Sequence, residues 1–416
     1  MSAPPSKIHV LDKSDYTKHF VVDVPRSELA PLAPSSLRLT PKILGLSTNN
    51  FTYARLGHHM GWYDIYPLPT NTPKPYNDSK KYGRIAAWGY AEIVESTVPG
   101  LAVGQTLYGY YPITTGIETV RVKFAEHKGA KIASQLLVLD EHRQHLWIVY
   151  NRYTVCPPLK DLERTKGLDS LGWDGVVQGP WATSYTLNKY GFAWNEENRV
   201  HPSGPGEWTA QDADLRNATV VLLNASSKTA ISFADSLRQN RPKEHQPLTL
   251  VGIGSPASIQ NIEKTGLYDK VVLNSDHETT KAFIESTSTS RIVLLDFGAR
   301  EGAAEAWRTT LAASKLPFTF IILGSVVKPL NEETSGEWLS SRAANIIVSA
   351  SALKEKGIEV AGEKYFEEFF ADWEGFMSRN QTMKLEWREG VEGWSDGWEA
   401  LCKDEVRADV ALTFKF

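Results

Sequence analysis

Two kinds of hydrophobic pattern follow one another along the chain, and they predict two kinds of structure. Up to about residue 150, short β-branched and aromatic runs are separated by clusters of Pro, Gly and Asn, which is typical of antiparallel strands and turns. These runs are 19–24, 43–46, 84–94, 106–111 and 119–124. A long stretch rich in Gly, Pro and Asn, 46–78, follows one strand. We interpret it as either a functional loop or a surface insertion.

Beyond Pro180 the apolar runs become continuous instead of alternating. Three successive segments each consist of an apolar strand, a small polar turn and a helix pattern, and a fourth apolar run follows them. Strands of this kind are buried on both faces, as in a parallel sheet with helical crossovers. The segments are 219–240, 248–274, 291–314 and 318–327. The pattern predicts an α/β fold with a doubly wound, Rossmann-type sheet.

Length and composition add the expectation of two folded domains. A chain of 416 residues is too long for one ordinary core. From about residue 331 the sequence is helical and aromatic, as in 367–380, and it ends in a strand-like segment, 410–416. The 13 Trp and 16 Tyr indicate either a large aromatic core or a pocket lined with flat rings.

Charge and cysteine content narrow the choice of partners. A net charge of −4 and a pI of about 6.2 give no reason to expect nucleic acid or an anionic membrane as a partner. The N-terminal segment lacks the apolar region of a signal peptide, and no window approaches the roughly 18 apolar residues of a membrane span. The only cysteines, Cys156 and Cys402, suit a reducing compartment. We therefore expect a cytoplasmic protein that acts on a small molecule.

The turn 224–230 is the strongest candidate for a phosphate site, because it lies between an apolar strand and a helix. In a doubly wound sheet, backbone N–H groups and the positive end of the helix meet a phosphate at this position. The glycines of a GxGxxG motif are missing, so the same residues could instead cap the helix alone. The candidates are Asn224, Ser226, Ser227, Lys228 and Thr229, of which Lys228 adds a positive charge.

Other candidate cofactor contacts follow the later strands. The second strand ends at Gly252–Ser255 without the Asp or Glu that usually binds the ribose 2′-OH of NAD, which favours NADPH with Ser255 near its 2′-phosphate. The ends of the next two strands carry small or acidic residues where adenine, ribose and nicotinamide would lie; glycines there also serve as plain turns. The candidates at these strand ends are Gly252, Ser255, Asp296, Gly298, Gly324 and Ser325.

Metal and nucleophile chemistry have little support. Two cysteines cannot form a four-cysteine zinc site. His58, His59 and Asp64 are close in sequence, but adjacent histidines on a loop rarely point the same way, so a surface or pocket role is the simpler interpretation. There is no GxSxG elbow, and neither cysteine has a histidine nearby in sequence. We predict no metal site.

The whole chain resembles the medium-chain dehydrogenase/reductase superfamily. The resemblance rests on ILGLSTNNFTYA (43–54), YGRIAAWGYAEIVESTVPGLAVGQTLYGYYP (82–112) and PWATSY (180–185), and on LLDFGAR and FIILGSV in the later strands. More narrowly, TNNFTYA, GWYDIYP, LYGYYPITT, YNRY and NASSKTA resemble a little-characterised branch described as a domain of unknown function. The alcohol dehydrogenases of the superfamily have a catalytic zinc-binding cysteine near the position of Asn49 or Asn50, and this chain has none, so the resemblance implies no zinc alcohol dehydrogenase mechanism.

The resemblance implies a domain plan. A partly open, GroES-like β-barrel is joined by a helix to a Rossmann domain, and the C-terminus returns to the barrel. We expect the catalytic GroES-like domain over 1–185 and 331–416 and the nucleotide-binding domain over 186–330. Members of the superfamily often dimerise through an edge of the Rossmann sheet, so a homodimer is possible.

Three functions remain open. The first is a zinc-independent, NADPH-dependent reductase of an activated carbonyl, enone or quinone. Its proton donors or oxyanion partners are candidates of phenol and carboxamide type: Asn50, Tyr53, Tyr63, Tyr110 and Tyr153. The second is a cofactor-free enzyme for dehydration, aldol cleavage or hydrolysis, with His59, His58 or Asp64 as base. The third is a non-catalytic ligand-binding protein.

Overall fold

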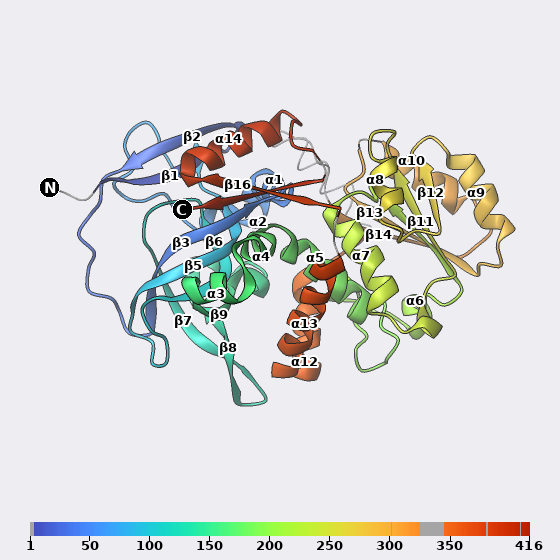
Figure 1. The fold of residues 1–416 in the computed structure, drawn as a ribbon, viewed down its shortest axis with the longest axis horizontal. Coiled ribbons are helices and arrows are strands. Elements are labelled where there is room, and N and C mark those ends of the chain that lie inside the picture. Colours follow the sequence, from blue (N-terminus) through green and yellow to red (C-terminus); the bar gives the residue numbers. More distant parts are fainter. Residues whose placement is uncertain (1–3, 301, 325–344, 380–381, 408) are drawn as a thin grey trace. The chain divides into compact units, whose positions relative to one another are not determined.

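The computed structural model describes residues 4–300, 302–324, 345–379, 382–407 and 409–416. These residues form two compact units (Figure 1). Unit 1 holds the described residues of 4–179 and 384–416, and unit 2 holds those of 180–324 and 345–383. The contacts therefore assign 345–383 to the second unit, whereas the predicted boundaries grouped 331–416 with the first.

Unit 1 is built from strands that pair antiparallel except for β16 and β17, as the short runs separated by turn residues predict. A three-stranded sheet has the order β2-β1-β4, and a larger eight-stranded sheet has the order β16-β17-β3-β5-β6-β9-β8-β7. An additional pairing of β3 with β7 closes six of these strands into a ring, which confirms the predicted barrel. The strands are β1 (Ser6–Asp12), β2 (Asp15–Val24), β3 (Ser36–Leu46), β4 (Tyr82–Gly83), β5 (Ala86–Ser96), β6 (Gln105–Pro112), β7 (Glu118–His127), β8 (Ala130–Val138), β9 (Arg152–Pro158), β16 (Lys384–Glu389) and β17 (Val410–Lys415).

The C-terminal strands complete the larger sheet of unit 1. β17 pairs antiparallel with β3, with Leu412 opposite Leu46, and β16 runs parallel to β17. The predicted return of the C-terminus to the barrel is therefore confirmed. Helix α14 (Gly390–Cys402) lies between these two strands in sequence and packs on both.

The stretch 46–78 contains short helices where a loop was predicted. They are α1 (Asn49–Arg55), α2 (Gly57–Met60) and the 3₁₀-helix η1 (Trp62–Asp64). Helices of seven and four residues are too short to show a helical repeat of apolar positions, so the turn-forming residues between them dominate the sequence pattern. The other helical elements of unit 1 are η2 (Glu141–Arg143), η3 (Ile148–Asn151), α3 (Leu159–Lys166), α4 (Leu168–Trp173) and η4 (Asp174–Gln178).

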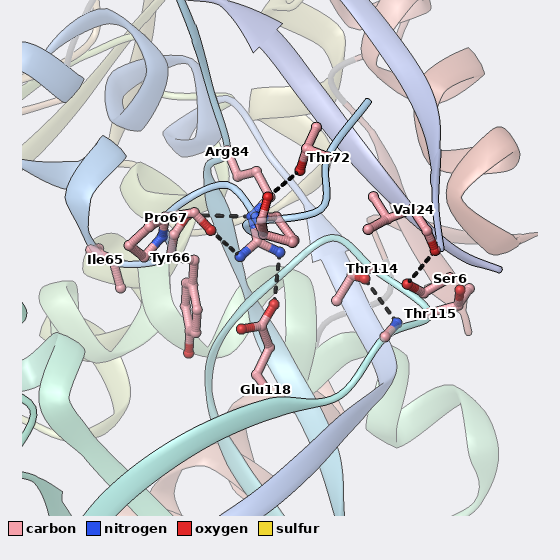
Figure 2. Close-up of polar contacts among 12 residues, drawn as sticks. Ser6, Val24, Ile65, Tyr66, Pro67, Thr72, Arg84, Thr114, Thr115 and Glu118 are labelled. Carbon is pink, nitrogen blue, oxygen red and sulfur yellow. Dashed lines mark hydrogen bonds and ion pairs between the residues drawn. The ribbon is translucent and has the colours of Figure 1, made fainter. Parts of the chain in front are cut away.

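A buried arginine fixes the chain that follows these helices. Figure 2 shows the guanidinium of Arg84 between two backbone carbonyls and a carboxylate. Its Nη2 donates to the carbonyl of Pro67 at 2.6 Å and its Nε to that of Tyr66 at 3.3 Å, while Nη1 pairs with Glu118 of β7 at 2.7 Å. Since a buried charge needs a partner, this arginine ties residues 66–67 to the barrel wall.

Unit 2 contains a six-stranded parallel sheet in the order β12-β11-β10-β13-β14-β15. This is the 3-2-1-4-5-6 order of a Rossmann sheet, and it confirms the predicted fold. The strands are β10 (Ala218–Leu223), β11 (Thr249–Gly254), β12 (Lys270–Leu273), β13 (Arg291–Phe297), β14 (Phe318–Gly324) and β15 (Ile346–Ile347). The helical elements are α5 (Gly179–Thr186), η5 (Leu187–Gly191), α6 (Ala210–Ala213), α7 (Lys228–Gln239), η6 (Lys243–His245), α8 (Ile259–Lys264), α9 (His277–Ser286), α10 (Ala303–Ala312), α12 (Ala350–Ala361) and α13 (Glu363–Arg379).

Helix α13 explains why 345–383 belongs to unit 2. Its Phe369 and Trp373 pack on Trp181 of α5, with ring centroids 5.0 and 5.3 Å apart. At its C-terminal end Arg379 forms a two-pronged ion pair with Asp235 of α7, at 2.8 and 3.2 Å. The aromatic face of this helix is therefore buried against helices of the Rossmann unit.

Candidate functional site

The turn between β10 and α7 has a defined shape that does not depend on glycine. Asn224 adopts the left-handed conformation, with φ of 55°, which asparagine tolerates better than most residues. The N–H of Ser227 donates to the carbonyl of Asn224 at 2.9 Å, and the Ser227 hydroxyl accepts from the N–H of Ala230 at 3.2 Å. Ser227 is therefore the N-cap of α7, as the capping interpretation proposed for this turn.

The same turn keeps the features that a phosphate needs. Lys228 and Thr229 are the first two residues of α7, a helix of 12 residues whose positive end attracts anions. Asn224, Ser227, Lys228 and Thr229 are half-buried, while Ser226 is buried. Capping by Ser227 uses the third N–H of the helix. The residues present therefore fit a nucleotide phosphate.

The later strand ends differ in how much of their chemistry remains available. The Asp296 carboxylate accepts from the N–H groups of Gly298 at 3.0 Å and Ala299 at 2.7 Å, so it shapes its own turn. A Cβ on Gly324 would lie 2.4 Å from the Phe297 carbonyl carbon, so close packing of two strand ends requires glycine there. Ser325 lies outside the described residues.

Ser255, at the end of β11, is held by a neighbouring serine. Its N–H donates to Ser258 Oγ at 3.0 Å, and the two hydroxyl oxygens are 3.1 Å apart. Both residues are half-buried. Ser258 Oγ also donates to the carbonyl of Ser255 at 3.2 Å. The Ser255 hydroxyl is therefore the one that can donate to a phosphate oxygen, which keeps Ser255 a candidate for the 2′-phosphate.

Unit 1 contains a dense group of aromatic side chains, which we call the aromatic cluster. It consists of Tyr53, Trp62, Trp88, Tyr110 and Tyr150. Tyr53 lies 5.0 Å from Trp62 and 5.1 Å from Tyr110 between ring centroids, and Tyr150 lies 5.1 Å from Tyr110. Trp88 Nε1 donates to the Tyr53 hydroxyl at 3.2 Å. Elements as far apart in sequence as α1, β6 and η3 supply these rings.

Two polar atoms of the aromatic cluster are buried without a hydrogen-bond partner among the described residues. They are the hydroxyl of Tyr110 and the indole Nε1 of Trp62. Tyr110 is 0% exposed and Trp62 is 5% exposed. Leaving a buried donor unpaired costs free energy, so such atoms mark places where a water or a ligand group is expected.

Burial keeps these phenols protonated. Desolvation raises the pKa values of Tyr53, Tyr110 and Tyr150 above the ordinary value of a tyrosine. At neutral pH the hydroxyls are therefore hydrogen-bond donors and not bases. Burial also raises the pKa of Cys156 and of Cys402 to about 12, which disfavours a thiolate nucleophile in this chain.

The other predicted catalytic residues are engaged elsewhere. Asn50 accepts from the N–H of Ser47 at 2.9 Å and donates to the carbonyl of Ala86 at 3.1 Å. The Tyr63 hydroxyl donates to the carbonyl of Ala54 at 2.8 Å. His59 is exposed on α2. The structure thus brings only Tyr53 and Tyr110 of the predicted set into the aromatic cluster.

Tyr153 belongs to a neighbouring polar cluster around a buried arginine. Its hydroxyl lies 2.9 Å from that of Tyr66 and donates to the carbonyl of Tyr110 at 3.2 Å. Arg143, which is 1% exposed, donates from Nη1 to both phenol oxygens at 3.3 Å. It also donates to Asn151 Oδ1 at 2.7 Å and to the carbonyl of Tyr150 at 2.8 Å. Arg143 thus holds the backbone of the aromatic cluster in place.

Sequence reasoning missed Trp62, Trp88, Tyr150 and Arg143. The three aromatic residues stand in segments that carry the family resemblance, and Trp and Tyr are abundant in the chain, but neither signal says which rings meet. Within the part of the chain that the structure describes, no three His, Cys, Asp or Glu side chains are grouped as metal ligands. No helix among the described residues is long and apolar enough to span a membrane.

Comparison with solved structures shows which proteins have a similar fold. CurA of Vibrio vulnificus in complex with NADPH matches with a TM-score of 0.51 at 12% identity, covering 98% of both chains. A mutant enoyl thioester reductase from Candida tropicalis matches with 0.54 at 11% identity, covering 100% of both. The mycobacterial protein Rv1454c, complexed with NADPH, matches with 0.54 at 12% identity, covering 99% of this chain and 100% of the other. At this level of identity the likeness shows the fold, which is that of medium-chain reductases.

Sequence comparison gives the family. No curated protein matches the chain. A family whose description is "Protein of unknown function (DUF2855)" matches residues 44–407, which is most of the sequence. The chain therefore belongs to the DUF2855 family, on a full-length medium-chain reductase fold.

Proposed function

We propose that this protein is a zinc-independent, NADPH-dependent reductase of an activated small-molecule carbonyl, enone or quinone. The observation that carries the proposal is the turn 224–230 at the carboxyl end of β10, in which Ser227 caps α7 and the half-buried Lys228 is the first residue of that helix. Its position in the sheet is the one at which Rossmann folds bind a nucleotide phosphate. When bound, NADPH supplies the hydride.

The strand next to β10 supports the choice of NADPH. β11 ends without an acidic residue that would bind a free 2′-OH, and Ser255 presents a hydroxyl there instead. A 2′-phosphate is recognised by donors, and a carboxylate at this place would repel it. Two proteins of similar fold, CurA of Vibrio vulnificus and mycobacterial Rv1454c, have been solved in complex with NADPH. These matches support the same cofactor here.

The aromatic cluster belongs to the buried core of unit 1, and we further propose that a flat, conjugated substrate binds beside it. Aromatic rings bind planar π-systems through their faces and edges. Tyr110 and Trp62 contribute the two buried donors of the aromatic cluster that lack partners among the described residues. We infer that the Tyr110 hydroxyl donates a hydrogen bond to the substrate oxygen as negative charge develops on it. One such donor is worth about 10²- to 10³-fold in rate.

The test has two stages. NADPH and NADH are first titrated by fluorescence, with micromolar binding of NADPH and weaker binding of NADH expected. Loss of NADPH is then followed with a panel of enones and quinones. If the folded protein binds neither nucleotide, the reductase is excluded, and a cofactor-free enzyme or a binding protein replaces it. Turnover of a substrate without nucleotide selects the first of these.

A further inference from the structure

A tyrosine of unit 2 reaches from the start of β12 to the turn 224–230. Tyr268 lies between α8 and β12, and its ring covers Gly252 in the middle of β11. A Cβ at position 252 would lie 2.8–3.0 Å from three carbons of that ring, closer than side chains pack. Gly252, which the sequence suggested as a cofactor contact, therefore makes room for Tyr268.

The hydroxyl of Tyr268 ends at the turn itself. It donates to the carbonyl of Ala225 at 3.0 Å. Ala225 is 0% exposed and directly precedes Ser226 and Ser227. On its other side, the N–H of Ala225 donates to the carbonyl of Ile253 at 3.0 Å. The carbonyl and the N–H of Ala225 are thus both hydrogen-bonded, one to Tyr268 and one to β11.

The opposite side of the turn is bound to β13. Asn224 Nδ2 donates to the carbonyls of Phe297 at 3.2 Å and Gly298 at 3.3 Å. These contacts hold the left-handed conformation of Asn224 in a chain that lacks a glycine there. Two side chains from different strand ends therefore fix the path of residues 224–227.

We propose that Tyr268 and Asn224 are positioning residues that replace a glycine-rich loop and hold the turn 224–227 in its phosphate-binding shape. A glycine-rich loop reaches this shape through backbone freedom. Here hydrogen bonds from side chains hold it before the nucleotide arrives, which lowers the ordering cost of binding. The inference rests on the proposed function, because it assigns these residues to the NADPH site.

The test compares Tyr268→Phe with the wild type and with Tyr190→Phe. Tyr190 is a buried tyrosine of the same unit, on η5, and its hydroxyl makes no hydrogen bond to the turn. Three quantities are measured: the Kd for NADPH, hydrogen exchange of the amides of 225–230 without nucleotide, and the Tm. We expect Tyr268→Phe to raise the Kd about three- to tenfold, as the loss of one hydrogen bond predicts. We also expect faster exchange in 225–230 and less change elsewhere.

A second pair of variants separates conformation from hydrogen bonding at Asn224. Asn224→Gly keeps access to positive φ but loses the two bonds, whereas Asn224→Ala loses the bonds and strains the backbone. NADPH affinity should therefore fall in the order wild type, Asn224→Gly, Asn224→Ala.

Three outcomes would contradict the proposal in different ways. If the wild type does not bind NADPH, the proposed function fails and the inference fails with it. If the wild type binds and Tyr268→Phe matches it in Kd and exchange, only the inference is overturned. The inference is also overturned if Tyr268→Phe lowers the Tm and speeds exchange evenly over unit 2, because the tyrosine then serves stability alone.

Discussion

Two tyrosines of unit 1 should respond in opposite ways to the loss of one oxygen atom. Tyr153→Phe removes a hydroxyl that contacts Tyr66, the carbonyl of Tyr110 and Arg143. The Tyr66 hydroxyl still donates to the Tyr110 carbonyl at 2.7 Å and still accepts from Arg143 at 3.3 Å. Since the partners keep a second bond, we expect a cost of about 1–2 kcal/mol in the free energy of unfolding and not the sum of three bonds.

Tyr110→Phe removes a buried hydroxyl that has no partner among the described residues. Its effect on the free energy of unfolding should lie between zero and a gain of about 1 kcal/mol, because the phenylalanine relieves an unpaired polar group. If Tyr110 stabilises negative charge on the substrate, kcat falls by about 10²- to 10³-fold in the same variant. Tyr153→Phe should leave kcat within a few-fold of wild type.

The assay is urea unfolding followed by tryptophan fluorescence, with steady-state kinetics on the same preparations. Equal m-values are required before the free energies are compared. A clear loss of stability in Tyr110→Phe would show that its hydroxyl has a partner, which refutes the argument from the unpaired donor. An unchanged kcat would remove Tyr110 from the reaction. If Tyr153→Phe abolishes activity at normal stability, the two roles have been assigned the wrong way round.

Two further predictions concern unit 1. Burial lowers the pKa of His9 well below its ordinary value of 6.5, so the unfolded chain binds a proton at this histidine more readily than the folded chain does. The free energy of unfolding is therefore highest above pH 6.5 and falls below that pH by up to about 1.4 kcal/mol per pH unit. Urea unfolding between pH 7.5 and 5.5 should show this slope reduced in His9→Gln but not in the exposed His59→Gln, and equal slopes would contradict it. A Cβ on Gly45 would lie 2.3 Å from the carbonyl of Gly175, so Gly45→Ala should lower the free energy of unfolding by about 3 kcal/mol or more. A Cβ on Gly179 meets nothing closer than 3.8 Å, and a Gly45→Ala variant as stable as Gly179→Ala would refute the packing argument.

The strands of unit 2 could be predicted because burial on both faces leaves a direct trace in the sequence. All six residues of β10 and of β11 are buried, and their apolar runs are continuous. The barrel was predicted from alternation and turns together with a family resemblance. Neither source gives the pairing of β3 with β7, because register depends on contacts far apart in sequence.

The site was only partly predictable. The turn 224–230 is local, so its position between strand and helix could be seen in the sequence. The aromatic cluster is not local: Tyr53 and Tyr150 are far apart in sequence and are brought together by the fold. Helix α13 was expected to be helical and aromatic, but an amphipathic pattern does not say which sheet or helix covers its apolar face. Gly252 illustrates the same limit, because glycine is required there by the ring of Tyr268, which is 16 residues away in sequence.

Calorimetric titration of NADPH into the wild type and Lys228→Ala tests the central claim most directly, with the exposed Lys243→Ala of the same unit as control. We predict micromolar binding by the wild type and by Lys243→Ala. The affinity of Lys228→Ala should be about tenfold or more weaker, because one charge-assisted phosphate contact is worth about 1.5–3 kcal/mol. Equal affinities in all three proteins would show that the nucleotide does not bind at the start of α7. Absence of binding in the folded wild type would show that it does not bind at all.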